Sequence, residues 1–404
     1  MALLMVVVSL AIISAVVTDL LIDQNGSYQV ALRQRDALKA EAMAQSGLNL
    51  GQLFLIIQSK IQIYFTQFAE MGVPLPKPTV WEMLAIDSGL FQGLASGDLQ
   101  TTLGVDVSDA VKKRKEEEKI KLEKLMKEKE GKTRSTGGFF IAPEGGFGAF
   151  EGSFSVAVVD EESKISIRKW PDMQTDAKLR TRKLMAALVA PLKYNYLFKK
   201  IDRPDLIANI YDYLDVDEVR INPHATGDSW GSPFGGSEQE IYLGDKGIRP
   251  KNANLDGLDE LNLVHGFTDR HMQAFGPALT IYGDSPKINI LSAKEPVIEP
   301  LIRYCAKNDQ DPSLASQDWV DSAVKRWMEY KGTGQGPVSV KGFVAFLTKL
   351  PLSVDTKQCE GALGVESKYF RLKSQATVGG VSRTLTLVTR INSGQQERFY
   401  FRGQ

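Results

Sequence analysis

The chain has 404 residues, enough for two or three domains of ordinary size, and 43% of them are hydrophobic while 24% are charged. This composition excludes a disordered chain and leaves enough apolar residues for a substantial core. Lys and Arg together number 49, as do Asp and Glu, and this balance argues against a nucleic-acid-binding protein.

The N-terminal segment from Met1 to Val17 is apolar and carries no charged side chain. As a helix, the first 18 residues would be about 27 Å long, just enough to cross the hydrocarbon layer of a membrane. A secretory signal peptide would have basic residues before this segment and a small-residue cleavage site after it, and we see neither. Asp19 and Asp23 follow without a nearby Lys or Arg, which favours the side of the membrane away from the cytoplasm.

A helical pattern continues beyond the apolar segment. Apolar residues recur at helical spacing from Leu32 to Ile57 among charged residues, so we expect one long helix whose second half packs on another part of the protein. Gly26 and Gly47 interrupt the pattern, and each costs up to about 1 kcal/mol relative to Ala, so local bending or melting is expected. The prolines of residues 72–78 should end the helix.

The rest of the chain alternates between sheet and helix patterns. Residues 108–132 are rich in Glu and Lys three and four apart, which predicts a solvated helix or insertion rather than a coiled coil. Residues 153–160 and 163–170 read as two strands of a hairpin, and residues 175–349 are mostly helical. Strand patterns return in YFRLKSQATVGG, SRTLTLVTRI and QERFYFRG. This order predicts an α+β fold in which a helical insertion splits one sheet domain.

The sequence offers little that is typical of catalysis, and we expect no catalytic residue. GDSWG (Gly227–Gly231) has the spacing of a hydrolase nucleophile elbow around Ser229, but no strand precedes it and no helix follows it. The three histidines provide no metal-binding pair at helical spacing: His224, His265 and His271. Cys305 and Cys359 could form one disulfide in an oxidising compartment or remain two buried thiols.

Acidic residues are concentrated in two neighbouring segments. The end of an amphipathic helix and a segment after a glycine-rich loop contribute Asp212, Asp215, Asp217, Glu218, Glu238 and Glu240. Carboxylates at this density repel one another unless they are solvated or bridged by a hard cation, and calcium accepts such oxygen ligands with loose geometry. The glycine and the spaced glutamate of an EF-hand are missing. A calcium site and a polar helix end that faces water therefore both stay open.

Eight segments together carry a family resemblance, because they follow one another in the family's order. They are MALLMVVVSLAIISAVV, RDALKAEAMAQSGLNLG, DEESKISI, IANIYDYLDVDE, GSEQEIY, NANLDGLDELNLVHGF, KINILSA and VESKYFRLKSQATVGGVSRTL. In these segments, over most of its length, the chain resembles the minor pseudopilin K family of type II secretion systems. Residues 108–132 and 307–335 look like additions to the family pattern.

The resemblance implies a type IV pilin-like fold, with a long N-terminal helix and an antiparallel sheet that a large helical domain interrupts. We expect residues 1–70 to form the helix, with 1–18 as its membrane and assembly segment. Residues 71–170 would begin the pilin-like domain, residues 171–349 would form the inserted helical domain, and residues 350–404 would complete the sheet.

The resemblance also implies a function without catalysis. The family's K-type subunits are thought to lie at the pseudopilus tip, where they initiate or cap assembly and assist protein export. The implied partners are the I-type and J-type minor pseudopilins, the major pseudopilin and prepilin peptidase, with no nucleic acid. The helix would anchor the chain in the inner membrane by a single pass, with the globular part in the periplasm. The alternatives are a minor pilin of a type IV pilus machine and a membrane-anchored periplasmic hydrolase that uses Ser229.

The same resemblance implies roles for individual residues. Met1 would be the processed and methylated N-terminus, either after a leader that lies upstream or as the first residue left by cleavage. The membrane and assembly helix would include Leu3, Met5, Leu10 and Ile12. Most pilins carry a glutamate at the fifth mature position to neutralise a neighbour's terminal amine, and Met5 at that position fits a tip subunit. The family binds calcium in its helical domain, which favours as ligands Asp215, Asp217, Glu238 and Glu240.

Overall fold

The computed structural model describes residues 2–70, 81, 86–90, 152–245, 247–333, 338–392 and 394–404. The proline-rich break at 72–78, the charged segment 108–132 and Met1 lie outside these residues.

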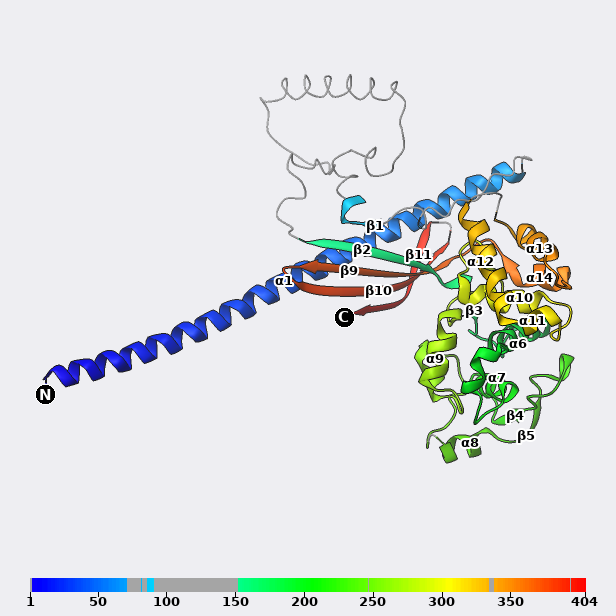
Figure 1. The fold of residues 1–404 in the computed structure, drawn as a ribbon, viewed down its shortest axis with the longest axis horizontal. Helices are drawn as coiled ribbons and strands as arrows, with labels where there is room; N and C mark the ends of the chain where they lie inside the picture. The colour runs from blue at the N-terminus through cyan, green and yellow to red at the C-terminus, as the bar shows by residue number, and fades with distance from the viewer. Residues whose placement is uncertain are drawn as a thin grey trace, which may run out of the picture.

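Helix α1 (Ala2–Glu70) is unbroken over 69 residues. The expected melting at Gly26 and Gly47 is therefore wrong, and contacts with the sheet explain why the helix continues through Gly47. The N-terminal half projects away from the rest of the protein, while the C-terminal half lies across the sheet (Figure 1). The large apolar side chains between Met5 and Ile22 are 48–72% exposed.

The sheet on which α1 packs is antiparallel and mixes segments from the two ends of the chain. Among the described residues its five strands have the order β1-β2-β9-β10-β11. They are β1 (Ile86–Asp87), β2 (Ser153–Asp160), β9 (Tyr369–Val378), β10 (Val381–Asn392) and β11 (Gln395–Gly403). The predicted turn Gly379-Gly380 joins β9 to β10 with positive φ at both residues, a conformation that glycine adopts readily.

Buried apolar side chains hold α1 against this sheet. Ala44, Leu48 and Leu55 of the helix share a buried apolar cluster with Phe154 and Leu372 of the strands. Apolar burial of this kind contributes about 25 cal/mol per Å² removed from water, so this interface is the main reason the second half of α1 is stable. The amphipathic pattern after residue 32 therefore reflects packing on the protein's own sheet.

The predicted hairpin of residues 153–160 and 163–170 is wrong. Strand β2 forms, but it pairs with β1 and β9. The chain then turns through a short 3-10 helix, η1 (Glu161–Ser163), and forms only the two-residue strand β3 (Ile165–Ser166), which lies parallel to β6 (Leu279–Thr280). The acidic turn cannot close a hairpin because its side chains are buried and bind other segments.

Three consecutive acidic residues, Asp160, Glu161 and Glu162, make those contacts between the sheet and the helical part, and all are buried. Asp160 Oδ2 accepts hydrogen bonds from three side chains of distant segments, Asn289, Ser292 and Ser367. Glu161 Oε1 accepts from Arg371 Nε at 2.5 Å, and its Oε2 accepts from Thr280 Oγ1 at 2.5 Å. Glu162 Oε2 accepts from the backbone amide of Lys368 at 2.5 Å. We call these three residues the acidic junction.

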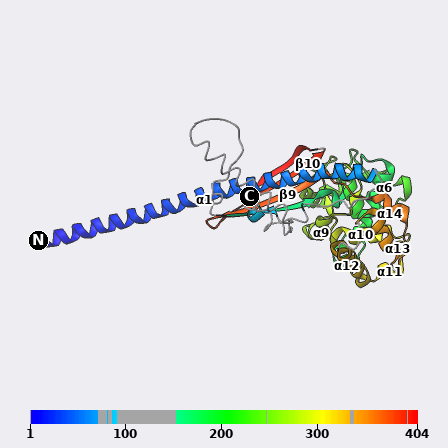
Figure 2. The same ribbon diagram turned by 90° about the horizontal axis from the view of Figure 1, so that it is seen from above.

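Between β3 and β9 the chain forms the helical part, which lies at the end of the molecule opposite the N-terminus (Figures 1 and 2). Its helices are α6 (Thr175–Val189), α7 (Arg203–Asp212), α8 (Glu238–Asp245), α9 (Asp269–Phe275), α10 (Glu295–Cys305), α11 (Pro312–Ala315), α12 (Gln317–Thr333), α13 (Val340–Thr348) and α14 (Thr356–Ala362). Its short strands are β4 (Val219–Ile221), β5 (Pro233–Ser237), β7 (Ile288–Asn289) and β8 (Leu363–Gly364). The 3-10 helices after η1 are η2 (Leu192–Leu197), η3 (Gly227–Ser229), η4 (Leu258–Leu263) and η5 (Gly276–Ala278).

A continuous apolar core supports these elements. Trp170 and Trp230 stack with ring centroids 5.4 Å apart, and Tyr211 meets both rings edge-on. Cys305 of α10 and Cys359 of α14 are fully buried and form a disulfide. The α+β class with a long N-terminal helix, an antiparallel sheet and a helical interruption is thus confirmed.

Candidate metal centre

The acidic residues meet where helix α7, the β4–β5 hairpin and helix α8 converge. Helix α7 starts with Pro204 in its first turn, and every residue from Leu206 to Asp212 is buried. Strand β4 then pairs with β5 so that Val219 lies opposite Ser237. This pairing returns the chain to the end of α7 and places Glu238, the first residue of α8, beside the acidic residues there.

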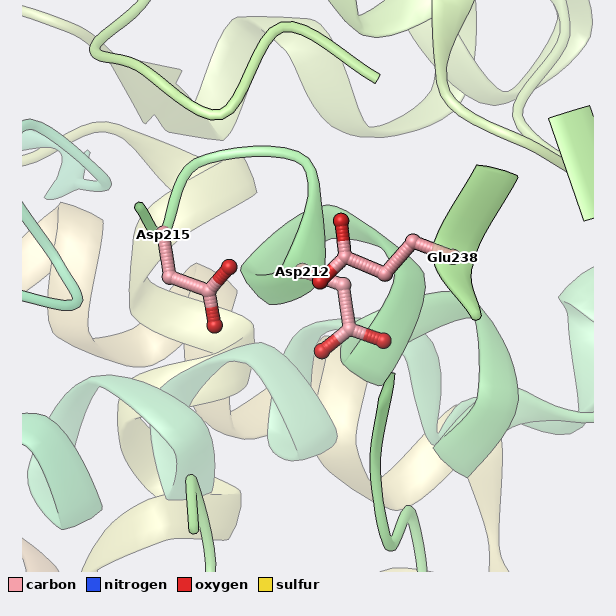
Figure 3. A group of neighbouring side chains, drawn as sticks. All are labelled: Asp212, Asp215 and Glu238. Carbon is pink, nitrogen blue, oxygen red and sulfur yellow. The ribbon is translucent and has the colours of Figure 1, made fainter. Parts of the chain in front are cut away.

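Three carboxyl groups form the centre: Asp212, Asp215 and Glu238. One carboxylate oxygen of each residue lies within 4.8 Å of one from each of the others. The residues are 3%, 6% and 1% exposed respectively. Figure 3 shows the three side chains directed toward a common region, two from the end of α7 and the following turn and one from α8.

The hydrogen bonding around the centre is incomplete. Asp212 Oδ1 accepts from the backbone amide of Ile221 at 3.2 Å. By contrast, Asp215 Oδ1 and both Glu238 oxygens are buried without a hydrogen bond of ordinary geometry. A buried acceptor without a donor costs about 1–3 kcal/mol, and more if it is charged. These oxygens therefore need a proton or a cation.

The pKa values of the three carboxyl groups are raised, which agrees with their need for a proton or a cation. Burial is the largest cause in each case, and it raises the pKa of Asp212 to about 7, that of Asp215 to about 8 and that of Glu238 to about 9. Negative charges add to the effect: Asp212 raises the pKa of Asp215, and Asp215 raises that of Glu238. The Lys178 ammonium partly opposes this for Asp215.

The donor set fits a hard divalent cation. Calcium binds carboxylate oxygens from segments with flexible spacing, and its charge would offset the repulsion among three buried carboxylates. The two oxygens of Glu238 are an independent indication of a bound cation, because they point into the centre and make no hydrogen bond of ordinary geometry. When bound there, calcium would supply structural cross-linking of α7, the β4–β5 hairpin and α8 rather than chemistry on a substrate.

The structure brings together only some of the residues that the sequence favoured as ligands. Asp215 and Glu238 lie in the centre, and Asp212 is the third member although the resemblance did not select it. Asp217 is exposed and its Oδ1 accepts from the amide of Val219 at 2.8 Å, while Glu240 is exposed on α8. The spacing of three between positions 212 and 215 at a helix end is the signal that could have identified Asp212.

The other candidate residues lie elsewhere. Ser229 is in the short 3-10 helix η3, exposed, and its hydroxyl donates to the carbonyl of Thr226 at 2.7 Å. No strand leads directly into this turn and no helix directly follows it among the described residues, so it is not a nucleophile elbow. Met5, Leu10 and Ile12 are 72%, 61% and 59% exposed on α1, which also includes Leu3.

Fold and site together define an α+β protein with a buried acidic centre in its helical part. Within the described part of the chain, one helix is long and apolar enough to cross a membrane. No protein-family profile and no curated protein matches the chain. Among solved structures, the chain is similar to one chain of "The Crystal Structure of the GspK-GspI-GspJ complex from enterotoxigenic Escherichia coli Type 2 Secretion System". The TM-score is 0.42 at 16% identity, and the match covers 73% of this chain and 99% of that chain.

Proposed function

We propose that the chain is a minor pseudopilin of a type II secretion system that lies at the pseudopilus tip and initiates or caps assembly. The main support for this proposal is the arrangement of α1. Its apolar half extends from the protein with 48–72% of each large apolar side chain exposed, and its other half packs firmly on the sheet. An exposed apolar helix of this length requires lipid or other apolar helices around it.

The apolar half of α1 would be surrounded first by lipid and later by the helices of other subunits. Before assembly, α1 anchors the subunit in the inner membrane with the helical part in the periplasm. During assembly, the same apolar surface packs against the helices of I-type, J-type and major pseudopilins. If prepilin peptidase leaves Met1 as the first residue, Met5 occupies the fifth mature position and supports the tip position, since a subunit without a neighbour above it needs no carboxylate to neutralise that neighbour's terminal amine.

A substitution in the apolar half tests this function directly. We expect Ala11→Arg to abolish both membrane retention and protein export, because an arginine at the centre of a spanning helix costs about 2.5–3.5 kcal/mol or more. Ala31→Arg is the matched control, because Ala31 is exposed on the same helix beyond the apolar segment. Export of the usual cargo by Ala11→Arg cells would contradict the proposal.

Mass spectrometry of the N-terminal peptide of the native membrane-extracted protein tests the class. We expect a methylated N-terminus at Met1, the product of prepilin peptidase. Cleavage after Val17 would indicate a secreted protein and would exclude a pseudopilin.

Deletion of the gene distinguishes a type II secretion system from a type IV pilus machine. Loss of an exported protein would indicate the secretion system, and loss of surface pili would indicate the pilus machine.

We further propose that calcium occupies the acidic centre as a structural ion. Calorimetric titration of the chelator-treated full-length protein in detergent should show a saturable calcium site. Asp215→Asn should remove this site, while Asp217→Asn, an exposed change two residues away, should keep it. Equal calcium binding by wild type and Asp215→Asn would contradict the assignment.

A further inference from the structure

A cavity of about 470 Å³ lies between α6, the end of α10 and the start of α14. These helices are neighbours in the helical part (Figure 1). The alanines at positions 186, 187 and 190 of α6 line one side, and their small side chains leave the space open. Residues 306–310, which follow α10, line another side. This loop begins the segment 307–335, which the proposed function leaves without a role. The volume is in the range of pockets that bind ligands.

Hydrogen bonds hold the walls of this cavity in place. The backbone amide of Lys307 donates to the carbonyl of Ser353 at 2.8 Å. Gln358 Nε2 of α14 donates to the carbonyl of Tyr304 at 2.5 Å, which joins the two helices. The disulfide between α10 and α14 lies next to both segments in the chain. The cavity is therefore formed before anything binds, and a ligand would not have to order its walls.

The charges that line the cavity are mainly positive. Lys183 comes from α6 and Lys307 from the loop after α10, and both are exposed. Neither forms an ion pair with a described carboxylate: Lys183 Nζ donates to Gln358 Oε1 at 2.8 Å. Asp309, also exposed, is the one acidic residue in the described lining. A hollow lined mostly by one sign of charge concentrates its field and attracts the opposite charge.

Arg303 of α10 adds a buried donor to the lining. Its Nη1 donates to the carbonyl of Leu314 at 3.0 Å, and its Nη2 donates to Gln317 Oε1 at 3.2 Å and lies 3.8 Å from Glu299 Oε1. The charge of Arg303 is thus partly balanced inside the protein. Its Nε is also buried but has no acceptor among the described residues. A buried donor without an acceptor is unfavourable, and a ligand oxygen would relieve that cost.

We propose that this cavity is a docking site for an acidic segment of a partner protein, whose Asp or Glu side chain binds Lys183 and Lys307. Two ammonium groups supply donors to both oxygens of one carboxylate, and the alanine side of the cavity accepts the apolar stem of the same side chain. Asp309 and the balanced charge of the whole chain disfavour a polyanion such as nucleic acid. The site depends on neither α1 nor the acidic centre.

Three variants separate binding in the cavity from a diffuse attraction by surface charge. Lys307→Gln removes one of the two charges, and the Lys307 side chain has no partner among the described residues, so the fold should be unaffected. Ala186→Phe fills the space from an exposed position and changes no charge. Lys325→Gln is the matched control, because Lys325 is exposed on α12 and does not line the cavity.

Fluorescence anisotropy gives the affinity of the full-length protein in neutral detergent for two peptides at physiological salt. One is an eight-residue peptide of alternating Glu and Ala, and the other has Gln in place of Glu, with the same uncharged fluorophore. We expect the Glu peptide to bind roughly tenfold more tightly. Lys307→Gln should weaken its binding roughly fivefold, and Ala186→Phe should weaken it at least as much. Lys325→Gln should match wild type.

Three results would overturn the docking site. Equal affinity of wild type for the Glu and Gln peptides would show that no carboxylate is recognised. Equal weakening by Lys307→Gln and Lys325→Gln, with Ala186→Phe like wild type, would show attraction by the surface as a whole. Wild-type protein that binds neither peptide would exclude the site altogether. Each of these results would leave the pseudopilin proposal, which rests on α1, unchanged.

Discussion

At the scale of single residues, burial rather than net charge makes the acidic centre distinctive. Glu218 and Glu240 carry the same carboxyl group as Glu238 but face solvent, whereas Glu238 is 1% exposed and makes no hydrogen bond of ordinary geometry. The folded protein therefore holds protons at the centre when no cation is present, because burial raises the pKa of all three carboxyl groups.

A pH dependence of stability follows for the cation-free protein. The folded pKa values of about 7 to 9 lie above the ordinary values of 3.8 and 4.5, so the folded state binds more protons than the unfolded state between them. Stability must then fall as pH rises through this window. We expect the melting temperature in chelator to drop by several degrees between about pH 5 and pH 9.

Two variants and the addition of calcium test whether the buried carboxyl groups cause this pH dependence. Glu238→Gln should make the pH dependence of the melting temperature shallower, because it removes one of the three carboxyl groups whose pKa burial raises. Glu240→Gln, an exposed change on the same helix, should leave the curve unchanged. Saturating calcium should restore the melting temperature at the alkaline end, since an ion that binds only the folded state stabilises it. Identical curves for Glu238→Gln and wild type would contradict this explanation.

At the scale of elements, close approach explains why α1 carries a glycine where it crosses the sheet. A Cβ atom at Gly47 would lie 2.5 Å from Ser374 Oγ and 2.8 Å from Phe154 Cδ2, while one at Gly26 would meet nothing within 4 Å. The two glycines look alike in the sequence, but only Gly47 is needed for packing.

The paired substitutions Gly47→Leu and Gly26→Leu test this difference. Gly47→Leu should destabilise the contact between α1 and the sheet by about 1–3 kcal/mol, since the added side chain cannot fit. Gly26→Leu should stabilise the helix slightly, because glycine is about 1 kcal/mol worse than good helix formers. Hydrogen exchange of α1 in detergent would report both effects, and equal protection in the two variants would refute the packing role.

The acidic junction is the second element-scale feature, because it joins the sheet to the helical part. Glu161 is fully buried and paired with Arg371, whose side chain is 35% exposed. Removal of one partner from such a pair costs about 3–5 kcal/mol, and partial solvation of Arg371 favours the lower value. Glu161→Gln should therefore lower the melting temperature by on the order of 10 °C. Glu329→Ala, an exposed change on α12, should not; equal effects of the two would argue against the junction.

At the scale of the whole molecule, the disulfide between Cys305 and Cys359 closes a loop with a sequence separation of 54. Closure of a loop of this length stabilises the folded state by roughly 4 kcal/mol in the chain-entropy description. The double variant Cys305→Ala/Cys359→Ala should accordingly melt at least several degrees lower than wild type. An unchanged melting temperature, with both proteins running alike on non-reducing gels, would show that the native protein lacks the bond.

Features that depend on local pattern could be predicted from the amino-acid sequence. Helix α1 (Ala2–Glu70) forms because apolar residues recur at helical spacing. Three strands form near the C-terminus because apolar and polar residues alternate between glycine turns. The mostly helical character of the described residues between 175 and 349 follows for the same reason, although Leu258–Leu263 form the tighter 3-10 helix η4. These patterns were sufficient for the α+β class.

Features that depend on contacts between distant segments could be seen only in the folded protein. The acidic turn at 160–162 reads as a hairpin turn until its partners at positions 280, 289 and 371 are known. Likewise, Asp212 and Asp217 are equivalent acidic residues in the sequence, and only the pairing of β4 with β5 places Glu238 next to the first and leaves the second in solvent. Local pattern specifies which segments become helix or strand, whereas burial and charge at a site depend on which segments meet.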